Sequence, residues 1–224
     1  MSAGTDLLVS DLTSHAFSVE DLAEKRAPNL HLSFGRVLSA NLADRVFSYL
    51  ESEIQYLSAA ESTIQIFGRK CAIPRKQTAF GDDGLSYKFS GVAVAAKPWD
   101  PVLHALKQLL QRCLDLDYNF VLVNRYADGK NYIGEHKDDE KDLDSSYPIA
   151  SLSFGQSRDF VLRHENRKRK LVSAEELPQN VTLCLRHGQL LLMHPPTNTF
   201  WYHSVPQRKR LLCPRVNLTF RKLL

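Results

Sequence analysis

The sequence predicts a β-rich α+β domain. Two segments with helical periodicity lie in the first half of the chain, and from Phe120 onward one short apolar or alternating strand follows another. Turn signals separate these strands, at Asp128-Gly129, Gly155-Gln156, His187-Gly188 and Pro195-Pro196. Short strands at regular spacing are typical of a sandwich or a barrel.

The composition fits one globular domain. The chain has 224 residues, of which 43% are hydrophobic and 24% charged, so a sizeable core can form. We expect residues 31–224 to form this domain. Residues 1–30 lack sustained periodicity and are predicted to be a disordered tail, with a short partner-binding helix around Val19 to Glu24 as the alternative.

Cysteine usage and leader signals bear on the compartment. Four scattered cysteines, Cys71, Cys113, Cys184 and Cys213, form no C-x-x-C pair, which argues against a zinc ribbon. No signal peptide and no membrane-spanning apolar run is visible. We therefore expect a reducing compartment and a monomer without membrane contact. The basic run 167–170 favours the nucleus.

Two helices are predicted. The first spans Asn41 to Leu57, with Asn41 as its N-cap and apolar residues at helical spacing. The second runs from Pro101 to about Leu114, with Asp100 as its cap and proline in its first turn. Both apolar stripes are explained by core packing.

Between these helices lie a strand at Ile64 to Phe67, a basic turn-rich segment, and a strand at Leu85 to Gly91 in which Tyr87 and Phe89 share a face. Aromatic residues beside a basic loop suit base stacking combined with phosphate contacts. Core aromatics beside a solvated turn are the alternative. Phe67, followed by Gly68, is a candidate wedge that fills the gap left by a flipped base, with Arg75 among the phosphate contacts; a core role for Phe67 is the alternative.

After Phe120 the predicted strands are 120–126, 132–138, 148–154, 158–164, 181–186, 189–194, 199–204 and 215–223. Basic residues cluster at 158–170 and at 208–222, and the net charge is +4. Such clusters suit a polyanion, although a solvated surface would explain them as well.

The last strand alternates cleanly. Val216, Leu218 and Phe220 share an apolar face, whereas the opposite face is polar and carries Arg215, Asn217, Thr219 and Arg221. Arginines inside a concave sheet need anionic partners, and a dicarboxylate fits because arginine binds carboxylates bidentately. A surface strand with solvated arginines is the alternative. Asn124 and Tyr126 likewise share a face and could bind the same ligand, or form a satisfied core pair.

The segment His136-Lys137-Asp138-Asp139-Glu140 places an imidazole and a carboxylate on one face of an extended chain. A second histidine from a distant strand would complete a two-histidine, one-carboxylate metal site, the ligand set of non-haem Fe(II) oxygenases. We expect that histidine to be His203, which lies in a polar and aromatic strand. A solvated acidic loop with a chance histidine is the alternative for the motif alone.

Taken together, these pieces resemble AlkB-type Fe(II)/2-oxoglutarate dioxygenases of nucleic acids. The resemblance rests on NRY at 124–126, HKDDE at 136–140, PIASLSFG at 148–155, WYHSVP at 201–206 and PRVNLTFR at 214–221. The segment 67–91 is most similar to the eukaryotic members that repair alkylated double-stranded DNA. Cys71 stands where a histidine is expected in the hairpin.

The resemblance implies a double-stranded β-helix (jelly roll) core with N-terminal helices and a hairpin that contacts nucleic acid. It implies Fe(II) at His136, Asp138 and His203, with O₂ as the oxidant. It implies that 2-oxoglutarate, the co-substrate, is held by Asn124, Tyr126, Arg215, Thr219 and Arg221. It implies damaged-base and DNA contacts from Phe67, Arg75, Tyr87, Phe89, Asp139 and Glu140.

The implied activity is DNA repair by oxidative demethylation. N-alkyl lesions such as 1-methyladenine and 3-methylcytosine would be hydroxylated and would lose formaldehyde, with double-stranded DNA preferred and single-stranded DNA a second substrate. Alternatives are an RNA or protein demethylase of the same superfamily, or a catalytically inactive reader of methylated nucleic acid. Formaldehyde release on different substrates would distinguish them.

Overall fold

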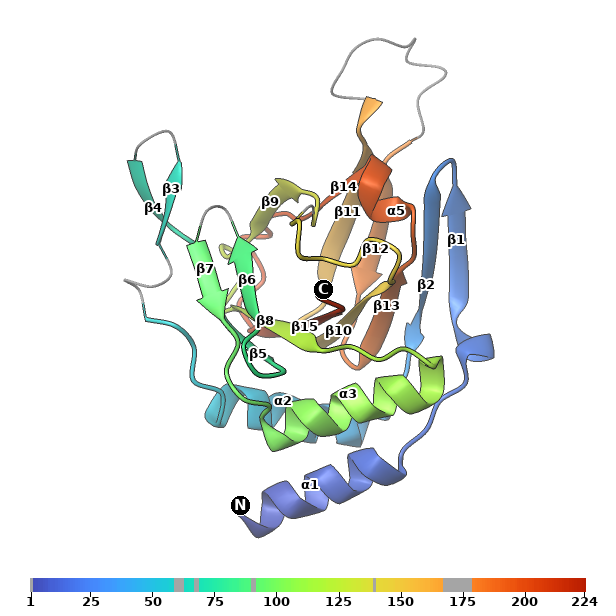
Figure 1. The fold of residues 1–224 in the computed structure, drawn as a ribbon, viewed down its shortest axis with the longest axis vertical. Coiled ribbons are helices and arrows are strands. Elements are labelled where there is room, and N and C mark those ends of the chain that lie inside the picture. Colours follow the sequence, from blue (N-terminus) through green and yellow to red (C-terminus); the bar gives the residue numbers. More distant parts are fainter. Residues whose placement is uncertain (1, 59–62, 67–68, 90–91, 139, 167–178) are drawn as a thin grey trace.

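The computed structural model describes residues 2–58, 63–66, 69–89, 92–138, 140–166 and 179–224, with the backbone alone at 64–66, 69–72, 87–89 and 92–94. Helices pack on one face of a large antiparallel sheet, and a smaller antiparallel sheet covers part of the other face (Figure 1). The predicted α+β class with many short strands is confirmed.

The larger sheet holds seven strands in the order β1-β2-β13-β10-β15-β8-β5. Their bounds, in that order, are Ala23–Ala27, Leu30–Arg36, Gln189–Met193, Ile149–Gly155, Arg215–Arg221, Phe120–Tyr126 and Lys76–Gly81. The smaller sheet has the order β12-β11-β14-β9. Its strands span Val181–Leu185, Arg158–His164, Trp201–Val205 and Ile133–His136.

Two hairpins stand apart from these sheets, on the β5 side of the molecule (Figure 1). One pairs β3 (Thr63–Ile66) with β4 (Arg69–Ala72), and the other pairs β6 (Ser86–Phe89) with β7 (Val92–Ala95). The predicted strands at 64–67 and 85–91 are each half of one hairpin. Their partners β4 and β7 were not predicted. Strand β4 lies in the basic segment that was expected to be a turn.

The helices are α1 (Ala3–Ser14), α2 (Ala40–Ser52), α3 (Pro101–Leu114) and the short α5 (Thr197–Phe200), with a 3-10 turn at Val19–Asp21. Helix α3 begins as predicted, since the Asp100 carboxylate accepts from the Val102 and Leu103 amides. Helix α2 differs: Ser39, not Asn41, caps it by accepting from Leu42 N. Among the described residues no helix is long and apolar enough to cross a membrane.

The expected disordered tail is instead folded. Leu8 and Leu12, one helical turn apart in α1, are 3% and 0% exposed, and the helix packs against α2 and α3. Asp11 forms an ion pair with Arg45 of α2, and residues 23–27 form an edge strand of the larger sheet. Only a narrow apolar stripe is buried, which is why the sequence shows no sustained periodicity.

Most later strands fall close to their predicted bounds. Strands β8 and β11 match the predicted 120–126 and 158–164. The predicted strand 199–204 is wrong at its start, because residues 197–200 form α5 before β14 begins. Strand β5 was missed within a segment that looked like a turn, and it pairs with the outer edge of β8.

Strand β15 is buried along its whole length. Val216, Leu218 and Phe220 are fully buried on the helix side, as the alternation predicts. The polar face carries arginines that are 1% and 4% exposed, so the alternative of a solvated surface strand is wrong. The space between the two sheets therefore contains buried charge.

Candidate active site

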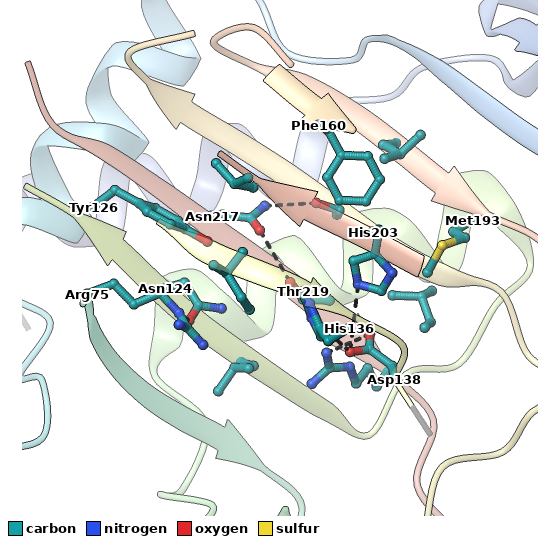
Figure 2. A pocket seen from close by; sticks show the side chains of 17 residues that line it. Arg75, Asn124, Tyr126, His136, Asp138, Phe160, Met193, His203, Asn217 and Thr219 are labelled. Carbon is teal, nitrogen blue, oxygen red and sulfur yellow. Dashed lines mark hydrogen bonds and ion pairs between the residues drawn. The ribbon is translucent and has the colours of Figure 1, made fainter. Parts of the chain in front are cut away.

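Three potential metal ligands meet between the sheets. His136 ends β9, Asp138 follows it by two residues, and His203 lies on β14 directly opposite His136 in the strand pairing. The Oδ1 atom of Asp138 lies 3.7 Å from His136 Nε2 and 3.9 Å from His203 Nε2. All three ligand atoms lie within 4.8 Å of one another (Figure 2). The predicted cluster forms as the spacing suggested.

Neighbouring groups orient these ligands. His136 Nδ1 donates to the Gly134 carbonyl at 2.9 Å, so that the Nε2 lone pair faces the cluster. Asn198 of α5 accepts from the Asp138 amide at 3.0 Å and donates to the Asp138 carbonyl. The ring of Phe160 stacks on His203 with centroids 5.3 Å apart. Each ligand is thus held by a contact outside the cluster.

The charge states suit a cation. Burial lowers the pKa of His203 to about 3 and also lowers the pKa of His136, where nearby Asp138 partly opposes the effect. Both imidazoles are therefore neutral near pH 7. Burial disfavours ionisation of Asp138, but the positive charge of Arg221 beside it outweighs this effect and lowers the Asp138 pKa. The cluster therefore offers a metal ion two neutral imidazoles and one carboxylate anion.

The separations of Asp138 from the two histidines fit a transition metal. Two atoms each bonded to one ion at about 2.0–2.2 Å can lie no more than roughly 4.4 Å apart, and both Asp138 separations are shorter than that. Asp138 Oδ1 is buried and has no hydrogen-bond partner among the described residues, whereas Oδ2 accepts from Arg221 at 2.7 Å. One oxygen is therefore available for an ion.

A polar cavity adjoins the cluster, lined by Asn124 and Tyr126 from β8 and by Asn217, Thr219 and Arg221 from β15 (Figure 2). The pairing of β8 with β15 brings these residues side by side, Asn124 opposite Asn217. Apolar side chains form much of the remaining lining, from Leu122, Ile133, Ile149, Phe160, Leu191, Met193 and Val205. These apolar lining residues could not be told from ordinary core residues in the sequence.

Arg75 also lines this cavity, which differs from its expected role as a surface phosphate contact. The side chain is 6% exposed, and its Nε donates to Asn124 Oδ1 at 2.7 Å. Residue 75 immediately precedes β5, and the pairing of β5 with β8 turns it toward the interior. Its position suits a group bound inside the cavity.

Arg215 lies deeper than the lining residues. It is 1% exposed, its Nη2 donates to Ser153 Oγ at 3.0 Å, and its guanidinium carbon lies 5.2 Å from the Tyr126 ring centroid. Burial lowers its pKa. Its Nε and Nη1 have no hydrogen-bond partner among the described residues, so the group retains unused donors.

Other predicted contacts are less well defined. Phe67 and Asp139 lie outside the described residues, and Tyr87 and Phe89 are placed by backbone only, in β6. Glu140 is half-buried and directly follows the cluster segment. The roles predicted for these residues stay predictions.

The comparisons with known proteins decide the family. Residues 33–221 match the 2OG-Fe(II) oxygenase superfamily. The chain belongs to this superfamily. The resemblance noted from the five motifs is confirmed, and with the His-Asp-His cluster it makes the chain an Fe(II)/2-oxoglutarate-dependent dioxygenase. Fe(II) is the cofactor and 2-oxoglutarate the co-substrate.

Individual relatives agree with this family assignment. The chain is 47% identical over 204 residues to the DNA oxidative demethylase ALKBH2 of Mus musculus, covering 91% of this chain and 84% of that protein. It is 48% identical over 199 residues to ALKBH2 of Homo sapiens, covering 89% and 76%. The solved structure of OsALKBH1 superposes with a TM-score of 0.55 at 15% identity, covering 88% of this chain and 100% of that chain, a likeness of fold alone.

Proposed function

We propose that this oxygenase is a DNA oxidative demethylase, which removes N-methyl groups from lesions such as 1-methyladenine and 3-methylcytosine. The observation that carries the proposal is the 47% identity to the mouse DNA oxidative demethylase ALKBH2, over 91% of this chain. The substrate class is the same as that implied by the motifs. The hydroxymethyl product of such a lesion loses formaldehyde and leaves the unmodified base.

The residues divide between two tasks. His136, Asp138 and His203 hold the iron, which with 2-oxoglutarate and O₂ supplies the oxidising power for hydroxylation. Asn124, Tyr126 and Thr219 bind the co-substrate by hydrogen bonds, while Arg215 and Arg221 neutralise its carboxylates. The unused donors of Arg215 support its assignment to the far carboxylate.

The electrostatics favour cationic bases. Ionised Asp138 is neutralised by the metal and by Arg221. Asp139 and Glu140 follow it in the chain and add negative charge near the damaged base. A 1-methyladenine or 3-methylcytosine ring carries a positive charge and is attracted, whereas a neutral methylated base is not. Asp139→Asn should narrow the difference in rate between these two kinds of lesion.

DNA contact is proposed at three places. Arg208, Lys209 and Arg210 are exposed in the segment between β14 and β15 and suit phosphates. The β3–β4 hairpin is proposed as the nucleic-acid-contacting element, and Phe67, which follows β3 in the sequence, is proposed to fill the stack from which a base is flipped. Tyr87 and Phe89 of β6 are proposed to stack on the damaged base.

The finer features follow as part of the same proposal. The two facing sheets form a double-stranded β-helix with iron in its interior. The enzyme acts as a monomer in the nucleus and prefers double-stranded to single-stranded DNA. Phe67→Ala tests the last point: repair of duplex DNA should fall far more than repair of single strands, at an unchanged melting temperature. Equal losses of repair on both substrates would indicate that Phe67 is a core residue. They would also remove this reason for a duplex preference.

The decisive experiment measures formaldehyde and succinate from the Fe(II)-loaded protein with four methylated substrates: duplex DNA, single-stranded DNA, RNA and a peptide. Turnover on DNA, lost in Asp138→Ala, is expected. Faster turnover on RNA or peptide would favour a different demethylase of the superfamily. Tight binding to methylated DNA without formaldehyde or succinate would instead indicate a reader.

A further inference from the structure

Arg158, at the start of β11, is a buried arginine to which the reaction as described assigns no role. In the sequence it belongs to a basic cluster suited to a polyanion, yet it is 2% exposed. Its Nη1 donates to the Asp128 carbonyl at 3.2 Å, and its Nη2 donates to the carbonyls of Asn131 and Pro206, each at 2.8 Å. A phosphate contact is therefore excluded for this side chain.

The three carbonyls belong to two segments next to the co-substrate cavity. Residues 127–131 form the turn that directly follows Tyr126 at the end of β8, and Pro206 begins the segment that returns to β15. Backbone hydrogen bonds join the two segments: Arg208 N donates to Gly129 O at 2.7 Å, and Gly129 N donates to Leu211 O at 2.8 Å. Arg158 thus joins the turn at residues 127–131 to the segment that begins at Pro206.

The same guanidinium lies against the Tyr126 ring. Its Cζ is 5.5 Å from the ring centroid, and the Cζ of Arg215 is 5.2 Å from it, so two buried cations contact one aromatic side chain. Tyr126 is 2% exposed, and its hydroxyl end is directed into the cavity (Figure 2). Arg158 therefore contacts the ring of Tyr126 and also holds the turn that directly follows it in the chain.

We propose that Arg158 is a positioning residue for the co-substrate, which fixes the Tyr126 phenol so that it meets the far carboxylate of 2-oxoglutarate. The inference rests on the co-substrate role proposed for Tyr126. Arginine suits the task because its planar fork reaches carbonyls on different segments while it stacks on a ring. A lysine keeps the charge and loses both the fork and the stacking.

The test is direct binding of 2-oxoglutarate to the Mn(II)-loaded protein, measured by titration calorimetry without turnover. Arg158→Lys and Arg158→Met should each weaken binding by about ten-fold, in the range seen when residues that orient a ligand-binding group are removed. Arg186→Met, an exposed arginine outside β11, is the matched control and should bind normally. If Arg158→Met does not fold, Arg158→Lys, with its smaller change, decides.

A double-mutant cycle separates positioning from a general loss of stability. If Arg158 acts through Tyr126, the Arg158→Lys, Tyr126→Phe double variant should bind 2-oxoglutarate about as well as the weaker single variant. If the losses of affinity in the two single variants multiply in the double variant, the inference is overturned. It is also overturned if Arg158→Lys binds 2-oxoglutarate within about two-fold of wild type. Normal binding by Tyr126→Phe overturns it together with the proposed role of Tyr126. The demethylase activity is tested separately by formaldehyde release.

Discussion

The buried pair of Asp138 and Arg221 makes a strong prediction about stability. The two side chains are 4% exposed, and Arg221 Nη2 lies 2.7 Å from Asp138 Oδ2. Arg221→Met removes the cation and leaves the buried carboxylate without its ion-pair partner. Breaking a buried ion pair in this way costs roughly 3–5 kcal/mol in the free energy of unfolding.

That loss should be visible by thermal unfolding of the metal-free protein. For a chain of this size each kcal/mol lowers Tm by about 2–4 °C, so a decrease of roughly 6–20 °C is expected. Mn(II) should restore a large part of it, because the ion supplies positive charge at the other oxygen of Asp138. Wild type should gain less from Mn(II) than the variant does.

The double variant Asp138→Asn, Arg221→Met is the control that decides the cause. It lacks both charges, so it should be more stable than Arg221→Met alone, although two substitutions have been made. Mn(II) should not stabilise it, because the anionic ligand is gone. If the double variant is less stable than Arg221→Met, lost packing and not an uncompensated carboxylate explains the effect, and the electrostatic account of the site is wrong.

Three further predictions test other parts of the fold. Leu12→Ala in α1 should cost about 2–5 kcal/mol in urea unfolding, because the side chain is fully buried, while exposed Leu7→Ala should cost less than about 0.5 kcal/mol; equal effects would mean that α1 is detached. Gly129→Ala should lower Tm and weaken DNA binding, since a Cβ there would lie 1.8 Å from the Arg208 carbonyl oxygen, whereas Gly134→Ala meets nothing within 4 Å and should leave Tm unchanged. Burial and stacked His31 lower the pKa of His194 to about 4, so the unfolded state binds more protons and stability should fall as pH drops from 6.5 toward 4; His194→Gln should flatten that fall in urea midpoints measured across this range.

The metal cluster was predictable from the sequence because its geometry is local or has a distinctive partner. The spacing of two residues in an extended segment places His136 and Asp138 together, although β9 ends at His136, and His203 lies in a strand of unusual polarity. Helix α3 was predictable for the same kind of reason, since its cap, its proline and its apolar stripe agree. In these cases the local pattern and the tertiary structure require the same conformation.

The parts that were not predictable depend on distant contacts. Helix α1 buries only two leucines, and their burial depends on contacts with α2 and α3 that the N-terminal sequence does not encode. Arg158 and Arg163 look alike in a basic cluster, yet one is 2% exposed and the other has a side chain that is 41% exposed. An arginine in a sequence fits a solvated surface or a buried, hydrogen-bonded position equally well until the pairing of strands is known.

The distribution of buried charge explains why a dicarboxylate suits this cavity. At one end, Asp138 has Arg221 on one oxygen and leaves the other for the metal. At the opposite end, Arg215 and Arg158 contact Tyr126, and among the described residues no ion pair joins either of them to a carboxylate. Two desolvated cations are costly in a folded protein. Such an arrangement is favourable when an anion arrives, which supports the proposal that the far carboxylate of 2-oxoglutarate binds at the end of the cavity where positive charge is otherwise unbalanced.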